Sequence, residues 1–317
     1  MASTQRLSRE ELIGTYYEKM EQVPPTAWLG GMSEYVPSGA VANSYRMTGM
    51  VPRLKEGSGP LEAEALTQNE FTIRNKEYKA GLRIPANDLR RDQTGQLAAR
   101  IADFSAEGDD HFMELLSTLI MNGESALCYT LQPFFSASHV EGDSGTYSNL
   151  WAHGDTPSLQ VTDPDNPTDY EFMKAVKQII PKFYAYKDDK GRPRNRRARK
   201  FMIMVGTNLM TQAMACTSDG QLDTGSGTIK NPLVGNKKFT LDFDVNPDLT
   251  WTNKFVIARV DGNLKPLIRQ EEVKVKPDVF GPESEYFRLN DEALIKINTT
   301  RSVGYGTPWQ MGLATFA

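Results

Sequence analysis

Two Asp-Ser/Thr-Gly triplets are the residues of this 317-residue chain that could carry hydrolytic chemistry, Asp143-Ser144-Gly145 and Asp223-Thr224-Gly225. An aspartic protease needs two such carboxylates about 3 Å apart, sharing one proton, each on a tight turn at the end of a buried strand. Both triplets lie in polar stretches, and neither follows an apolar strand. Two surface turns explain them better. An aspartic protease that uses Asp143 and Asp223 is kept as an alternative.

Few other residues could form a catalytic or metal site. Ser136 and His139 are close in sequence, but no Gly-x-Ser-x-Gly turn surrounds the serine, and the chain has three histidines in all. Asp163, Asp165 and Asp169 resemble part of a calcium loop that lacks its glycine and its terminal glutamate. We therefore expect a protein that is not an enzyme, with no catalytic residue, cofactor or metal.

A basic run from Lys190 to Lys200 is the sharpest charge feature. It could contact nucleic-acid phosphates, although it has no interleaved aromatic residues for base stacking. It could also be a solvated loop, or a contact with an acidic neighbouring subunit. Its arginines of interest are Arg194, Arg196, Arg197 and Arg199.

Composition indicates a soluble protein of a reducing compartment. The chain is 39% hydrophobic and 24% charged, with a net charge of −4. Cys128 and Cys216 are far apart in sequence, and neither has metal-like spacing, which favours free thiols. The N-terminus lacks a signal-peptide pattern, and no apolar run is long enough to cross a membrane. We therefore expect a cytoplasmic chain without a membrane partner.

A strand pair and a long helix organise the chain. Apolar and polar residues alternate from Phe71 to Ile84, which predicts a pair of half-buried strands before a turn at Pro85. A single apolar stripe then predicts a helix over 94–122. Asp92 and Thr94 are its candidate N-caps, and the pair Asn122-Gly123 is its stop signal.

The first 75 residues are too thin to build a core of their own. A short amphipathic helix over 10–20 is followed by proline, glycine and isolated apolar anchors, so residues 1–45 are predicted to drape over something else. A polar, glycine-rich tip between two strand-like flanks predicts a protruding hairpin over 45–71. A two-stranded ribbon is marginal alone, so both segments are expected to need partners.

The rest of the chain mixes strands and helices without a βαβ rhythm, which predicts the α+β class. We expect helices over 169–180, ended by Pro181, and over 209–216. The apolar run 201–205 suits a buried central strand. Further strands are expected over 127–131, 239–245, 255–260, 267–275, 293–297 and 304–313.

Several stretches, taken with this order of elements, resemble the major capsid proteins of tailed bacteriophages, and more narrowly the major head subunits of Mu-like phages. The stretches lie across most of the chain: Phe71 to Asp92 with its NKEY and IPANDLRRD, Phe134 to His139 with Ser148 to Leu150, Lys265 to Gln270, and Arg301 to Gln310.

The resemblance implies the Hong Kong 97-type capsid fold and a structural protein. Copies of the chain would form hexamers and pentamers of an icosahedral head around double-stranded DNA, assembled in the host cytoplasm and found in the virion. It also implies a separate scaffolding protein or prior cleavage, a portal, and in some relatives a decoration protein. An encapsulin-like compartment of the same fold is the alternative.

The resemblance also implies a division of the chain and a set of contact residues. The parts are an N-terminal arm (1–45), an extended loop (46–75), a peripheral domain with a spine helix (76–185), an axial domain (186–265) and return strands to the peripheral domain (266–317). Contacts between subunits are expected at the extended loop, the arm and the axial loops: Arg53, Lys55, Glu56 and Leu61; Tyr16 and Trp28; and Arg194, Arg196, Arg197 and Arg199.

Overall fold

The computed structural model describes residues 9–21, 26–48, 68–91, 96–224 and 227–317. Its helices are α1 (Arg9–Glu21), α2 (Ala27–Met32), α3 (Ala86–Arg91), α4 (Gln96–Met121), α5 (Asp169–Ala185), α6 (Met210–Ser218) and α7 (Glu285–Asn290). Its first strands are β1 (Ser33–Pro37), β2 (Ala42–Thr48), β3 (Gln68–Arg74), β4 (Lys76–Pro85), β5 (Leu150–Trp151) and β6 (Lys200–Val205). The others are β7 (Gln221–Asp223), β8 (Thr228–Lys230), β9 (Thr240–Val245), β10 (Lys254–Arg259), β11 (Leu267–Phe280), β12 (Glu292–Tyr305) and β13 (Met311–Thr315).

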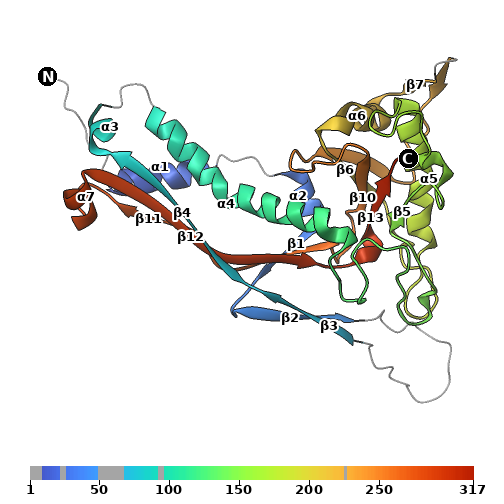
Figure 1. Ribbon diagram of the computed structural model, residues 1–317, viewed down its shortest axis with the longest axis horizontal. Coiled ribbons are helices and arrows are strands. Elements are labelled where there is room, and N and C mark those ends of the chain that lie inside the picture. Colours follow the sequence, from blue (N-terminus) through green and yellow to red (C-terminus); the bar gives the residue numbers. More distant parts are fainter. Residues whose placement is uncertain (1–8, 22–25, 49–67, 92–95, 225–226) are drawn as a thin grey trace.

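An elongated four-stranded sheet forms one half of the molecule (Figure 1). Its strand order is β1-β11-β12-β4, with β1 parallel to β11 and the other pairs antiparallel. Helices α1 and α4 contact each other and the long strands. Alternate residues of β12 are buried, among them Ala293, Ile295 and Ile297, which pack against α4 residues such as Leu97 and Ile101. The period-two pattern thus gives the sheet one helix-covered face.

Helix α4 joins two hydrophobic cores. Its first half contributes Leu97 and Ile101 to the core on the long sheet. Its second half contributes Phe112, Leu116 and Ile120 to a core shared with the five-stranded lobe. The helix was predicted over 94–122 and is observed from Gln96, followed at once by a 3₁₀ turn, Asn122–Glu124. The candidate caps Asp92 and Thr94 lie outside the described residues.

A five-stranded lobe forms the other half (Figure 1). Its order is β5-β13-β10-β6-β9, and α5 and α6 pack against it around a large aromatic and aliphatic core. The predicted buried strand 201–205 lies between β10 and β9, as expected for an apolar run. Strand β13 and helix α5 belong to this lobe. The division into a peripheral domain (76–185), an axial domain (186–265) and return strands (266–317) stays a prediction.

Three local predictions are also corrected. Helix α5 continues through Pro181 to Ala185, because Pro181 lies on the exposed face while Ile180 and Phe183 are buried in the core. Strands β3 and β4 do not pair with each other, since β3 pairs with β2 and β4 with β12. Residues 127–131 form an isolated bridge between Leu127 and Pro133 instead of a strand.

The arm packs on its own chain. Helix α1 contacts α4, and Tyr16 is buried in the core of the long sheet. Helix α2 places Trp28 and Met32 in the core shared by the two halves. Strand β1 then pairs with β11 from Ser33 to Pro37. In the described part of the arm, the surface over which residues 1–45 were predicted to drape therefore includes the cores and strand β11 of the same chain. No described helix is long and apolar enough to cross a membrane.

Candidate functional site

A two-stranded ribbon, β2 with β3, stands away from both halves of the molecule (Figure 1). The strands pair antiparallel from Ala42 with Arg74 to Thr48 with Gln68. Such a ribbon is marginally stable in water unless its base is held. Its base is therefore the place where the chain fixes the direction of the hairpin.

Asn75 is the centre of that base. It is the single residue between β3 and β4, and its side chain is buried. Its amide nitrogen donates to the Ala40 carbonyl at 2.9 Å, to Ser38 Oγ at 3.2 Å and to Glu272 Oε2 at 3.3 Å. Its amide oxygen accepts from Gln270 Nε2 at 2.6 Å. One side chain thus ties the ribbon, the arm and β11 together.

Gln270 extends this network to the ribbon. It is fully buried on β11, and its amide nitrogen also donates to the Ile73 carbonyl at 3.3 Å. Its amide oxygen accepts from the Tyr45 hydroxyl at 2.7 Å. Ile73 packs so closely on Gly304 of β12 that a Cβ at that position would collide with the isoleucine. Polar and apolar contacts therefore fix the same end of the ribbon.

A column of aromatic rings holds the ribbon from the side of the lobe. Tyr45 and Phe71 are cross-strand partners and stack at a centroid distance of 5.4 Å. Phe71 stacks in turn on Tyr129 at 6.5 Å. The Tyr129 hydroxyl donates to Glu141 Oε1 at 3.0 Å. Burial, followed by the charge of Glu141, raises the pKa of Tyr129, so the phenol stays protonated and remains a donor.

The residue after Gln270 faces the other side of β11 and holds α4. Glu271 and Arg301 form a buried ion pair at 2.8 Å, with side chains 8% and 2% exposed. Arg301 also donates to Thr299 Oγ1 at 3.0 Å and to the Gly108 carbonyl of α4. Its guanidinium lies 4.1 Å from the centroid of the Phe112 ring. Neighbouring residues of β11 therefore contact the ribbon and the long helix.

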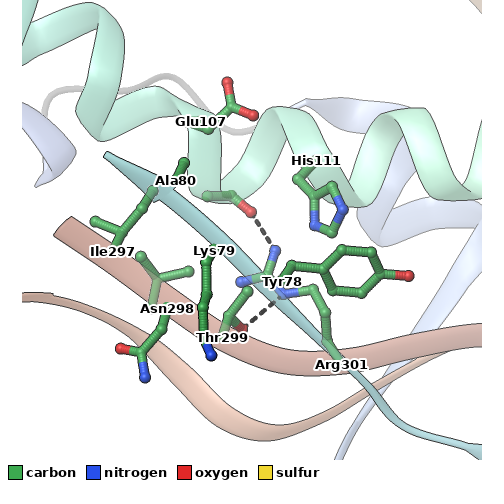
Figure 2. A pocket seen from close by; sticks show the side chains of 11 residues that line it. Tyr78, Lys79, Ala80, Glu107, His111, Ile297, Asn298, Thr299 and Arg301 are labelled. Atoms are coloured by element: carbon green, nitrogen blue, oxygen red, sulfur yellow. Dashed lines mark hydrogen bonds between the residues drawn. The ribbon is translucent and has the colours of Figure 1, made fainter. Parts of the chain in front are cut away.

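A small cavity opens between α4 and the sheet beside Arg301 (Figure 2). His111 meets Tyr78 edge-on at a centroid distance of 4.3 Å, and Lys79 and Asn298 lie at the sheet side. Arg301, the buried cation at this cavity, already forms an ion pair with Glu271. We therefore interpret the cavity as a gap in the packing between α4 and the sheet. Among the described residues, no group of His, Cys, Asp or Glu side chains could hold a metal ion.

The predicted contact residues fall into three groups. Arg53, Lys55, Glu56 and Leu61 lie outside the described residues. Tyr16 and Trp28 are 0% and 2% exposed within their own chain, so these side chains present no surface to a neighbour in this conformation.

The third group, the four arginines of the basic run, separates in the structure. Arg194 is internal, because its guanidinium pairs with Glu141 at 2.9 Å and lies 4.7 Å from the centroid of the Trp309 ring. Arg196, Arg197 and Arg199 are exposed.

The candidate hydrolytic residues are not built into a site. Asp143 and Asp223 are both exposed. The backbone N–H of Asp143 donates to the Asp189 carbonyl, whereas Asp223 ends strand β7. Ser136 Oγ contacts Ser138, and His139 contacts Thr130 and Phe134 instead of that serine. These contacts are those of turns and of a satisfied core histidine.

His139 predicts an acid-sensitive lobe. Burial lowers the pKa of this histidine from its ordinary value of 6.5, although the Phe134 carbonyl and Glu141 oppose the shift. The unfolded chain then binds more protons than the folded one, so stability is lost as the pH falls below about 6.5. We expect the urea midpoint of His139→Gln to fall less between pH 7.5 and pH 5.5 than that of the unchanged chain. His153→Gln, at an exposed position, is the control, and an unchanged pH slope in His139→Gln would contradict the assignment.

Sequence reasoning missed the residues that hold the ribbon. Asn75 stands at the polar centre of the alternating stretch 71–84, and that position was the available signal. Gln270 and Arg301 lie in stretches that drew attention for their resemblance to a family, but nothing in their spacing shows that they are buried. A buried polar group needs a partner, and the partners are distant in sequence.

Sequence comparisons connect this chain with phage head proteins. The family model of the Mu-like prophage major head subunit gpT matches residues 11–167. The major capsid protein of Escherichia phage Mu is 27% identical over 104 residues, which make up 33% of this chain and 34% of that protein. The match thus spans about a third of the length of this curated relative.

Solved structures of similar fold are shell proteins. The procapsid of bacteriophage JBD30 matches with a TM-score of 0.55 at 17% identity, over 96% of this chain and 74% of the other. The virus-like particle from Pyrococcus furiosus matches with a TM-score of 0.52 at 9% identity, over 96% and 98%. The capsid of a native GTA particle matches with a TM-score of 0.51 at 14% identity, over 93% and 91%. The predicted Hong Kong 97-type capsid fold is confirmed.

Proposed function

We propose that this chain is the major capsid protein of a tailed double-stranded DNA bacteriophage, because the family model of the Mu-like prophage major head subunit gpT matches residues 11–167. Copies of it would form the hexamers and pentamers of an icosahedral head. The chain would act through contacts and not through catalysis, and its place would be the virion after assembly in the host cytoplasm.

One observation carries this proposal: a ribbon with little core of its own is held rigidly at its base and projects from the subunit. The contacts of Asn75, Gln270 and Phe71 fix its direction. A rigid projection has low ordering entropy to lose when it lies on a partner. It is therefore suited to cross a neighbouring copy, with the tip residues as contacts: Arg53, Lys55, Glu56 and Leu61.

The proposed role as a major capsid protein also implies further partners. A head that fills with DNA implies a portal, a scaffolding protein and, in some particles, a decoration protein. The net charge of −4 suits a container whose DNA contacts are non-specific and reversible.

A second candidate is a protein compartment of the same fold with a protein cargo. The virus-like particle from Pyrococcus furiosus favours it, since that match covers 98% of the other chain. Purified particles distinguish the two readings, because a nuclease-protected DNA content supports the head and a protein content supports the compartment.

Deleting residues 57–64 tests the role of the ribbon. We expect the shortened subunit to be soluble and folded, because the described cores do not include this stretch, but to form no stable shells in negative-stain micrographs. Thermal unfolding of the shortened subunit is the control for folding. Normal particles assembled from the shortened chain would contradict the role of the ribbon as a contact between subunits.

A further inference from the structure

The five-stranded lobe carries opposite charges at the two ends of α5. Four exposed carboxylates lie at the first end: Asp163, Asp165, Asp169 and Asp219. They are near one another, since Gln212 of α6 donates to Asn166 at 3.0 Å and the charge of Asp219 adds to burial in raising the pKa of Asp169. Among the described residues, none of the four carboxylates forms a salt bridge.

The second end of α5 is basic and contains a groove. The groove is lined by Ile180, Pro181 and Tyr184 of α5 and by Phe239, with Arg199 and Lys238 at its rim. Six exposed cations surround this end: Arg196, Arg197, Arg199, Lys200, Lys237 and Lys238. In the described part of the chain, none of these cations has a carboxylate partner in a salt bridge.

The opposite charges at the two ends of α5 are too far apart to pair within one subunit. Helix α5 has 17 residues, so its ends are about 25 Å apart, beyond the Debye length of about 8 Å at physiological salt. Figure 1 shows α5 along the side of the lobe, with α6 and β7 at its upper end. Opposite charges at opposite ends of a rigid unit favour head-to-tail contact between copies, which closes into a ring when each contact adds a constant rotation.

We propose that the groove at the basic end of α5 receives the acidic end of the lobe of a second copy of this chain. The contact rests on the proposed function, since it would join neighbours within one hexamer or pentamer. The apolar floor would exclude water from the contact, while the rim cations set which end of the neighbour is accepted. The same pair of surfaces, the groove and the acidic end, would thus form each interface around the ring.

Charge reversal tests the pairing. Changing Arg196, Arg197, Lys237 and Lys238 to Glu leaves two of the six cations and adds four carboxylates, which makes the groove end acidic. Changing Asp163, Asp165 and Asp219 to Lys leaves one of the four carboxylates and adds three cations, which makes the acidic end basic. We expect each set of substitutions alone to lower the yield of rings and shells at least about tenfold, because like charges then face each other. Lys174→Glu with Lys177→Glu, exposed on α5 between the ends, is the matched control and should assemble normally.

Combining the variants gives the discriminating result. A chain with all seven substitutions has both ends reversed, so it should regain rings of five and six. An equal mixture of the two reversed chains can only alternate around a ring, so native mass spectrometry should show six-membered rings and no five-membered rings.

Two results would overturn the contact. They are a seven-substitution chain that melts normally but stays monomeric, and reversed chains that assemble as well as the control. If the unchanged chain forms no rings at all, the proposed function fails instead. Should a reversed chain fail to fold, Arg197→Gln with Lys238→Gln is used, and unaltered ring yield in that variant counts against the contact.

Discussion

Replacing Arg301 with methionine is expected to lower the free energy of unfolding by about 3–5 kcal/mol, because Glu271 is left charged and buried without its partner. The pair is 2% and 8% exposed, so solvent cannot replace the lost contact. The variant also loses the hydrogen bond from β12 to the Gly108 carbonyl of α4. Urea unfolding monitored by circular dichroism measures the loss.

Two variants show whether that loss comes from the unpaired charge. Arg301→Met with Glu271→Met removes both charges and should recover at least half of the lost stability, since apolar replacement of a whole buried pair is often neutral. Lys79→Met breaks an exposed pair with Glu77, 54% and 56% exposed, and should cost less than about 1 kcal/mol. If the double variant is no more stable than the single one, packing and not charge is what Arg301 contributes.

Replacing Asn75 with alanine is expected to cost about 2–4 kcal/mol and to leave the ribbon without a fixed direction. The change removes three donor contacts of Asn75 and the acceptor of Gln270, whose buried amide nitrogen then loses the shorter of its two hydrogen bonds. Hydrogen exchange of the amides of β2 and β3 should rise much more than that of β10. In the proposed head, the same variant should give few closed shells.

The control for Asn75 is Asn298→Ala. Asn298 lies on β12, partly exposed, and among the described contacts its side chain makes no hydrogen bond. Its exchange and unfolding should match those of the unchanged chain. Equal behaviour of the two alanine variants would show that Asn75 does not determine the direction of the ribbon.

Periodicity predicts the elements of this fold better than their partners. The stripe of α4 and the apolar run of β6 are local patterns, and both elements form close to where they were expected. The pairing of β3 with β2 and of β4 with β12 depends on residues far away in the chain, so alternation across 71–84 could not show it. The register of a strand and the sheet that it joins depend on tertiary contacts, which a local sequence pattern does not determine.

The sites of contact were less predictable for a related reason. Tyr16 and Trp28 are large and apolar in a segment with few other anchors, which indicates burial but not the chain that buries them. The basic run reads as one patch, yet Arg194 is drawn inward by Glu141, which lies 53 residues earlier in the chain. A run of like charges predicts a charged surface patch only when none of its side chains is buried against a partner that is distant in sequence.

The position of β13 has a consequence for how the protein is made. This strand follows every other described strand in the sequence, yet it lies between β5 and β10 inside the sheet of the lobe. A nascent chain folds from its N-terminal side first, so the lobe keeps an open slot until residues 311–315 leave the ribosome. Polypeptides that stop before residue 311 therefore cannot complete the sheet of the lobe.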